Sequence, residues 1–271
     1  MLHPNTLARD PAPVVARPSG SRWIGLQTHA PNARLRLIAF HHAGGNASFY
    51  QPWLKELQAL DWIEFVAVQL PGRGRRMAEP PVSELPALLD EMAEGLAELL
   101  DAPHVLFGFS MGAILAFELA QRRQRQALRM PLALVLAGRG APRQVRPAIT
   151  RGAFTRDMIV RELERLGGTD PVLLQDGPFL DVFMRTFQAD FAIADSHYCA
   201  IPEPLQCLMH VWGGADDPEV PIERLCRWID FAGERFDSHI FPGGHFFVRS
   251  AHKPVMKNLM RVLDTARRAS C

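Results

Sequence analysis

The residue best placed to do chemistry is Ser110, which lies in the pattern Gly108-Phe109-Ser110-Met111-Gly112. The residues before this pattern, 104–107, are typical of a short buried strand, and those after it, 113–120, are typical of a helix. The flanking glycines let the backbone turn sharply, and the helix N-terminus favours negative charge beside the serine. We therefore predict that Ser110 is a nucleophile on a strand-to-helix turn. The alternative is an ordinary serine in a glycine-rich turn.

A nucleophilic serine needs a base, and the ten histidines of the chain differ in their setting. His245 follows a predicted strand at 236–241 and precedes a predicted helix at 253–268, which places it in a loop at the carboxyl edge of a sheet. In the α/β-hydrolases the base occupies this position and comes last in chain order. His210 and His239 lie within predicted strands, where packing or surface roles are expected. We predict that His245 is the base.

The acid that orients the base is expected after the preceding strand, predicted at 207–212. Two adjacent aspartates follow this strand. Asp217 stands three residues after Gly214 and three before Val220, which is the usual spacing of glycine, aspartate and hydrophobic residue in such a loop. We therefore prefer Asp217. Asp216 remains the alternative, and otherwise it is a turn residue that bonds to its local backbone.

An oxyanion hole needs two backbone N–H donors close to the nucleophile. One candidate is the amide of Met111, the residue after the serine. The other is the amide of Ala43, in the loop His41-His42-Ala43-Gly44-Gly45 that follows a predicted strand at 35–40. Paired glycines allow the backbone to approach a ligand closely. We expect the two histidines to shape this loop rather than to transfer protons.

The order of the predicted elements defines the fold class. Apolar stretches without alternation are separated by helical stretches, which indicates a buried parallel sheet with helices on both faces. The predicted strands are 35–40, 64–70, 104–108, 132–137, 207–212 and 236–241, and the main predicted helices are 49–60, 84–100, 113–120 and 253–268. We predict an α/β-hydrolase fold with a mostly parallel central sheet and a helical lid insertion.

Two segments depart from this alternation. Residues 1–31 are proline-rich and are expected to form a flexible N-terminal extension, with a first strand near 23–28. Residues 32–271 form the predicted hydrolase domain. Within it, residues 141–201 lack a strand pattern and contain helical stretches at 155–166 and 179–195, too long an excursion for a plain loop. We interpret them as a lid, with a structural subdomain that takes no part in substrate binding as the alternative.

Composition narrows the class of protein. Hydrophobic residues make up 48% of the chain, charged residues 22%, and the formal net charge is +1, which gives no argument for a nucleic-acid partner. No apolar run reaches the length of a membrane span, and the N-terminus lacks the pattern of a secretory signal. The four cysteines show no metal-type spacing, so free thiols and a cytoplasmic location are expected.

Several stretches together resemble the type II thioesterases, the stand-alone editing enzymes of polyketide and non-ribosomal peptide pathways. The resemblance covers roughly residues 35–265, and it departs from the family at His41, where a proline is usual. The matching stretches are His42-Ala43-Gly44-Gly45, Leu70-Pro71-Gly72-Arg73-Gly74, the serine pattern at 108–112, Gln188-Ala189-Asp190-Phe191 and Phe241-Pro242-Gly243-Gly244-His245-Phe246-Phe247.

The resemblance implies hydrolysis of acyl groups from the phosphopantetheine arm of acyl or peptidyl carrier domains, through an acyl-Ser110 intermediate. It implies no cofactor and no metal, since the phosphopantetheine belongs to the substrate. We expect a monomer without nucleic-acid or membrane partners. The alternatives are a medium-chain fatty-acyl thioesterase, a small-molecule esterase, and a non-catalytic interaction protein of the same fold.

Carrier proteins are usually acidic, so arginines at the surface are the residues that could dock one. Arginines gather at 73–76, at 122–129 and at the start of the lid. Each group taken alone is first interpreted as a solvated surface. The lid group lies closest to the expected pocket mouth, so Arg143, Arg146 and Arg151 are the candidates for carrier docking.

Overall fold

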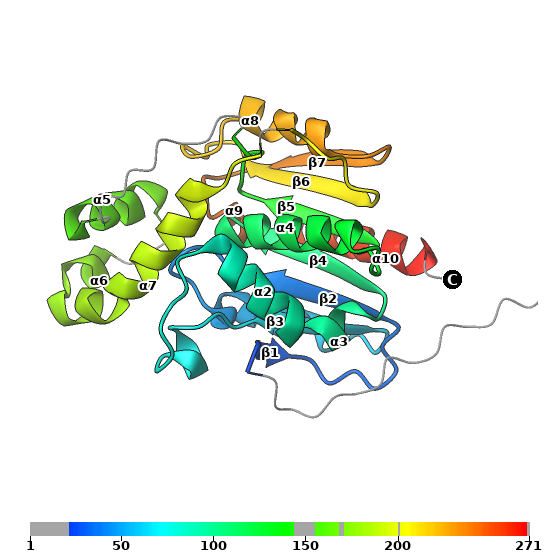
Figure 1. The fold of residues 1–271 in the computed structure, drawn as a ribbon, viewed down its shortest axis with the longest axis horizontal. Helices are drawn as coiled ribbons and strands as arrows, with labels where there is room; N and C mark the ends of the chain where they lie inside the picture. The colour runs from blue at the N-terminus through cyan, green and yellow to red at the C-terminus, as the bar shows by residue number, and fades with distance from the viewer. Residues whose placement is uncertain (1–21, 144–154, 168–170, 200, 270–271) are drawn as a thin grey trace, which may run out of the picture.

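A seven-stranded sheet runs through the centre of the molecule (Figure 1). The computed structural model describes residues 22–143, 155–167, 171–199 and 201–269. The strand order is β1-β3-β2-β4-β5-β6-β7, and every neighbouring pair is parallel except β1 with β3. The strands are β1 (Ile24–Gln27), β2 (Leu35–Phe40), β3 (Ile63–Val68), β4 (His104–Phe109), β5 (Ala133–Ala137), β6 (Leu208–Gly214) and β7 (Phe236–Phe241). The predicted fold class is confirmed.

Helices cover both faces of the sheet, which is why the inner strands are apolar without alternation. Along β2, Ile38 and Phe40 pack into one core, and Leu35, Leu37 and Ala39 pack into the other. The first core is closed by α2 (Leu85–Gly95), α3 (Ala97–Leu100), α4 (Met111–Arg125) and α8 (Ile222–Cys226). The second is closed by α1 (Gln51–Leu57), α9 (Phe247–Ser250) and α10 (His252–Ala269). Short 3₁₀ turns connect the rest at Ala47–Tyr50, Gly74–Arg76 and Arg227–Phe231.

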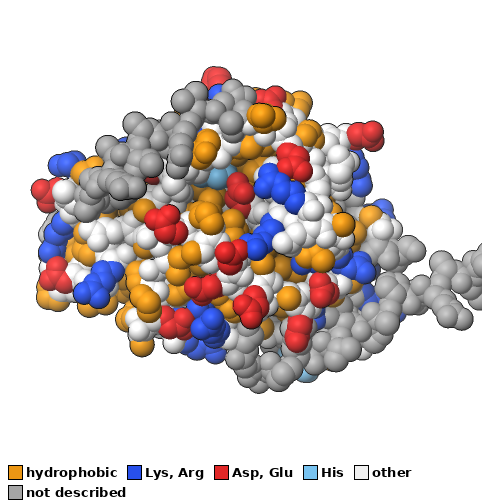
Figure 2. All heavy atoms as spheres, viewed as in Figure 1, with side chains coloured by type: hydrophobic (Ala, Val, Ile, Leu, Met, Phe, Trp, Pro, Cys, Tyr) orange, Lys and Arg blue, Asp and Glu red, His pale blue; other side chains and the backbone are white. Residues whose placement is uncertain are grey.

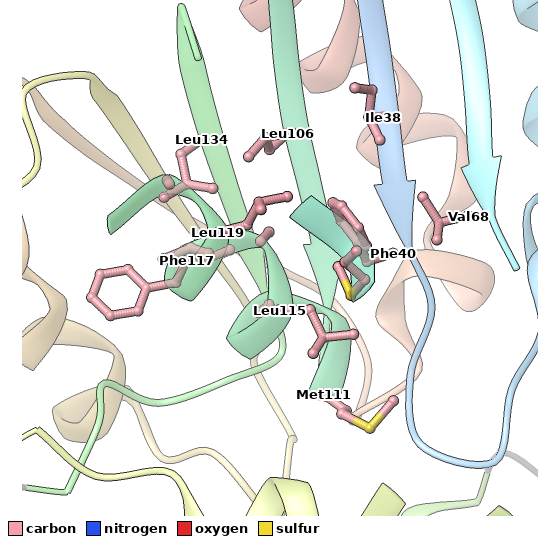
Figure 3. Close-up of a cluster of buried hydrophobic side chains, with 14 of the residues drawn as sticks. Ile38, Phe40, Val68, Leu106, Met111, Leu115, Phe117, Leu119 and Leu134 are labelled. Carbon is pink, nitrogen blue, oxygen red and sulfur yellow. The ribbon is translucent and has the colours of Figure 1, made fainter. Parts of the chain in front are cut away.

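Helix α4 is the most deeply buried helix and it carries the start of the predicted site. Its side chains Leu115 and Leu119 belong to the same core as Leu106 of β4 and Leu134 of β5, and Leu119 lies toward these two residues (Figure 3). Met111, at the first position of the helix, is fully buried in the same core. This packing holds the N-terminus of α4 rigidly against the carboxyl ends of the central strands.

The N-terminal part of the described chain belongs to the sheet. Strand β1 pairs antiparallel with β3, and the Thr28 hydroxyl oxygen accepts a hydrogen bond from the Phe65 N–H at 2.9 Å. We expected a flexible extension through residue 31. The first strand expected near residues 23–28 is β1, and residues 1–21 lie outside the described part.

Three helices lie beyond the carboxyl ends of the strands, at the left of Figure 1. They are α5 (Arg156–Leu166), α6 (Pro171–Gln175) and α7 (Gly177–Ser196), and α6 was not predicted. They share a small apolar cluster of their own, which includes Ile159, Leu163 and Phe187, whereas Ile193 near the end of α7 joins the main core. Within the described ranges, no helix is both long and apolar enough to cross a membrane.

Candidate active site

Ser110 occupies a sharp turn between β4 and α4 with backbone angles φ 55° and ψ −116°. A positive φ is unusual for a residue with a side chain, and here it turns the hydroxyl away from the sheet. The flanking glycines make this turn possible, because a Cβ added at Gly112 would lie 2.1 Å from the carbonyl oxygen of Phe40. One added at Gly108 would lie 2.2 Å from the Gly112 oxygen. The two glycines therefore allow α4 to start directly against the end of β2.

Two further side chains meet Ser110 from loops at the same edge of the sheet. The imidazole of His245, in the loop after β7, lies with Nε2 3.1 Å from the Ser110 Oγ. Its Nδ1 lies 2.8 Å from the Oδ2 of Asp217, in the loop after β6. With the Nδ1–H donating to the carboxylate, Nε2 can accept the serine proton. His245 and Asp217 are both buried, which keeps this chain of hydrogen bonds away from water.

The structure separates the two candidate aspartates. The second carboxylate oxygen of Asp217 accepts hydrogen bonds from the backbone N–H groups of Glu219 at 2.8 Å and Val220 at 3.3 Å. These bonds fix the carboxylate in the orientation that faces His245. Asp216 is exposed, and its own N–H donates to the Gly243 carbonyl at 3.0 Å. Of the two, only Asp217 reaches the histidine.

The two candidate oxyanion donors follow two neighbouring strands of the sheet, Ala43 after β2 and Met111 after β4. Met111 begins α4, and Ala43 is the second residue of a tight turn that the Gly45 N–H closes onto the His42 carbonyl at 3.1 Å. Neither amide of this pair donates to an acceptor in the described part of the chain. Strand order reverses between β2 and β4, and ligands of open α/β sheets bind at such a reversal. Both amides are therefore in the region where a substrate carbonyl is expected.

His41 is buried, His42 is half-buried at the cavity wall, and both histidines are uncharged at neutral pH. Burial lowers the pKa of His42 from 6.5 to about 4, and burial together with the nearby Arg73 cation lowers the pKa of His41 well below 6.5. The ring of His42 packs edge-on against Phe49 and Phe246. Each histidine directs Nδ1 to a backbone carbonyl of its own loop, His41 to the His42 oxygen at 2.8 Å and His42 to the Ala43 oxygen at 2.9 Å. These contacts agree with the loop-shaping role expected from the sequence.

Ser110 and His245 both line a cavity of about 670 Å³ between the sheet edge and the outer helices α5 and α7. Such a volume is within the usual range for small-molecule sites. The outer-helix wall is largely apolar and includes Ile159, Leu163, Leu166, Phe183, Phe187 and Phe191. The outer-helix wall also carries Glu162 of α5, and charged side chains at the remaining wall include Arg139, Arg143, Arg224, Arg249 and Glu219. One side of the cavity therefore suits an apolar acyl chain, and the other suits polar groups.

The arginines considered for carrier docking lie in different environments. Arg143 lines the cavity and pairs with Asp195 at 3.3 Å, both side chains being about half exposed. Arg146 and Arg151 lie outside the described residues. The group at 73–76 was interpreted as a solvated surface, and this is wrong for two of its members. Arg73 and Arg76 are only 2% and 3% exposed. Arg73 pairs with the buried Asp190, whereas Arg76 pairs with the partly exposed Glu79 and lies over the Trp23 ring.

One buried carboxylate near the site was given no role in the sequence analysis. Asp190, on α7, is 1% exposed and forms a two-pronged ion pair with Arg73. A signal was present, since an aspartate between Ala189 and Phe191 on an apolar helix stretch predicts a buried partner. The sequence did not indicate that the partner of Asp190 is Arg73.

A mostly parallel sheet whose fourth strand in chain order, β4, ends on a strained serine turn places this chain among the α/β-hydrolases. Comparison with known families is more specific. The family model described as "Thioesterase domain" matches residues 35–264. The chain belongs to this thioesterase family, and it is a thioester-hydrolysing enzyme.

Known relatives agree with this assignment. The chain is similar to the "Probable cadicidin biosynthesis thioesterase" of Streptomyces griseus, with 34% identity over 96% of this chain and 71% of that protein. It is also similar to the "Gramicidin S biosynthesis protein GrsT" of Aneurinibacillus migulanus, with 32% identity over 84% of this chain and 88% of that protein. Among solved structures, the type II thioesterase BorB from the borrelidin biosynthetic cluster superposes with a TM-score of 0.79 and 30% identity, covering 91% of this chain and 100% of that one.

Proposed function

We propose that this enzyme hydrolyses acyl groups from the phosphopantetheine arm of acyl or peptidyl carrier domains in polyketide or non-ribosomal peptide synthesis. The observation that carries the proposal is the hydrogen-bonded chain Ser110–His245–Asp217, which opens onto a cavity of about 670 Å³. The names of the relatives support the pathway, since they include a type II thioesterase and two proteins of antibiotic biosynthesis. Release of stalled or finished acyl chains is the role that follows.

The reaction proceeds in two steps on the serine. His245 Nε2 takes the Ser110 hydroxyl proton as Oγ attacks the thioester carbonyl carbon, and the Ala43 and Met111 amides stabilise the resulting oxyanion. The tetrahedral species collapses by breaking the C–S bond, and the thiol leaves with the proton held by His245. Water, deprotonated by the same imidazole, then attacks the carbonyl carbon of the acyl-Ser110 ester, and the imidazolium returns the proton to Oγ as the C–O bond breaks and the acid is released. Asp217 keeps the imidazole in the required tautomer throughout.

The carrier is proposed to approach the mouth of the cavity over the lid. Arg143 lies there, and we propose that Arg146 and Arg151 contribute to the same docking surface. The face shown in Figure 2 carries acidic, basic and apolar side chains that are interspersed, so that face presents no field of a single sign. An acidic carrier would therefore be attracted by a local group of arginines rather than by the net charge of +1.

Covalent labelling tests the nucleophile. A fluorophosphonate probe should add one label to the wild-type protein, and tandem mass spectrometry should locate it on Ser110. Ser110→Ala should remove both the label and the hydrolysis of a small acyl thioester. The exposed Ser250, which lies near His245 in sequence, provides the control, since Ser250→Ala should keep both. Labelling and hydrolysis that persist in Ser110→Ala would rule out the proposed nucleophile.

A further inference from the structure

The buried ion pair between Asp190 and Arg73 reaches the loop that is proposed to bind the oxyanion. The Asp190 Oδ1 accepts a hydrogen bond from Arg73 Nη2 at 2.9 Å, and Oδ2 accepts one from Arg73 Nη1. The same Oδ2 accepts a third bond, from the backbone N–H of Gly44 at 2.7 Å. A single carboxylate of the outer helix α7 therefore holds both the loop after β3 and the loop after β2.

These contacts fix two consecutive peptide groups of the oxyanion loop. The Ala43–Gly44 peptide is held at its N–H by Asp190 and at its carbonyl by His42 Nδ1. The preceding peptide, which carries the Ala43 N–H, is held at its carbonyl by His41 Nδ1 and by the Gly45 N–H. Because each peptide is planar, fixing these atoms sets the direction of the Ala43 N–H. Of the residues that hold these two peptide groups, Asp190 is the one that lies outside the loop.

Helix α7 also packs directly on the turn. Gly44 has φ 71°, in the left-handed region that favours glycine, and an added Cβ would lie 2.0 Å from the Phe187 ring. Thr186 adds a tie to the neighbouring loop by donating from its hydroxyl to the Gly72 carbonyl at 3.0 Å. The turn can therefore hold this conformation beside α7 only with glycine at position 44.

A buried ion pair is a weak source of stability, because desolvation offsets much of the attraction between its charges. What the pair does supply is a fixed carboxylate oxygen at the Gly44 N–H. We propose that Asp190 is a positioning residue for the oxyanion hole, so that the Ala43 amide faces the reacting carbonyl only while α7 is seated on the loop. This inference rests on the proposed function, since it takes Ala43 to be an oxyanion donor.

The test compares Asp190→Ala with a matched loss of a buried carboxylate elsewhere. Glu64 pairs with the buried Arg36 in strands β3 and β2, and the two residues lie near the amino ends of their strands, away from the site. Glu64→Ala therefore also leaves a buried arginine without its partner. Thermal unfolding should show that both variants are folded and that both are less stable than the wild type.

The deciding readouts are turnover and the affinity of an oxyanion mimic. An acyl trifluoromethyl ketone adds to Ser110 and places a hemiketal oxyanion in the hole. Asp190→Ala should lower kcat/KM for a small acyl thioester by about 100-fold, the effect of losing one oxyanion donor. KM should change by less than about threefold, and the inhibition constant of the ketone should rise in proportion to the loss of kcat/KM. Glu64→Ala should keep both values near those of the wild type.

Asp190→Asn keeps the shape of the side chain and removes its charge, so it should fall between Asp190→Ala and the wild type in both readouts. The inference is overturned if kcat/KM falls while the inhibition constant is unchanged, or if folded Asp190 variants match Glu64→Ala. It is also overturned if neither Asp190 variant folds, because the residue is then structural. If the ketone does not react with wild-type Ser110 at all, the proposed function fails instead.

Discussion

At the scale of single residues, the neighbouring aspartates Asp216 and Asp217 give a matched pair for testing the orientation of the base. Asp217→Asn should lower kcat/KM by at least roughly tenfold more than Asp216→Asn, because only Asp217 holds the Nδ1–H of His245. The loss is expected to be smaller than the ~10⁴-fold of serine proteases, since a thiolate leaving group needs little protonation. Steady-state kinetics on a small acyl thioester measures it. The reverse order would assign the acid to Asp216.

The site residues that could be found from the sequence are those that the fold requires at a particular place in the chain. Ser110 and His245 stand out because a nucleophile and a base must follow particular strands in a set order. Arg73 was interpreted as a surface residue and Asp190 was given no role, although both lie in stretches that resemble the thioesterase family. They are 117 positions apart, and nothing local to either residue indicates the other. Long-range pairing of charges depends on tertiary packing, which a single sequence does not show.

At the scale of elements, the outer helices are expected to differ in mobility. The second half of α7, residues 186–194, is tied to the body by the Asp190–Arg73 pair and by Ile193 in the main core. Helix α5 packs mainly within the small outer cluster. We therefore propose that α5 and α6 form the moving part of the lid and that the second half of α7 stays seated.

Hydrogen exchange followed by mass spectrometry tests this division of the lid. Peptides that cover α5 should exchange faster than peptides that cover residues 186–194, and the strands β4 and β5 should exchange slowest. The same experiment on Asp190→Ala should raise exchange in the peptide that contains Gly44. Equally slow exchange across all three outer helices would instead indicate a fixed cap.

Strands and helices with a clear hydrophobic pattern could largely be predicted from the sequence. Strands β2 and β7 have the predicted limits, and the parallel order followed from apolar strands separated by helices. The predicted helix at 84–100 is broken at Leu96, whose angles of φ −106° and ψ 0° leave the helical region. Helix α6 has only five residues, too few for a periodic pattern to be detected. Short elements of this kind are set by packing rather than by local sequence.

At the scale of the whole molecule, buried histidines should make stability depend on pH. Burial lowers the pKa of His104 and His42 to about 4, whereas an unfolded histidine has a pKa near 6.5. Between these values the unfolded chain binds protons that the native protein does not, so stability falls as pH drops from about 6.5 to 4. Each such histidine contributes a slope of about 1.4 kcal/mol per pH unit.

Urea unfolding at several pH values measures this slope. His104→Gln should make it shallower by about 1.4 kcal/mol per pH unit between pH 6 and 4.5, since the variant removes one group that must gain a proton on unfolding. The exposed His29 supplies the control, and His29→Gln should leave the slope unchanged. A slope that His104→Gln does not alter would show that this histidine is already charged in the folded protein.

Surface charge gives a second expectation at this scale. Reversing the charges of Arg143, Arg146 and Arg151 together should lower kcat/KM for an acyl-carrier substrate and reduce its dependence on ionic strength, because steering between charged partners is screened by salt. Hydrolysis of a small thioester should stay nearly unchanged in the same variant. A uniform loss on both substrates would place these arginines in catalysis or folding rather than in docking.

The most direct test of the proposed function is the efficiency of the enzyme on one acyl group presented in two ways. The kcat/KM for an acyl-phosphopantetheinyl carrier protein should exceed that for the matching acyl-coenzyme A by roughly tenfold or more, because only the carrier adds a protein surface and a steered encounter. The Ser110→Ala protein should hydrolyse neither substrate. Equal efficiency on the two substrates would contradict the account and favour a general thioesterase or esterase.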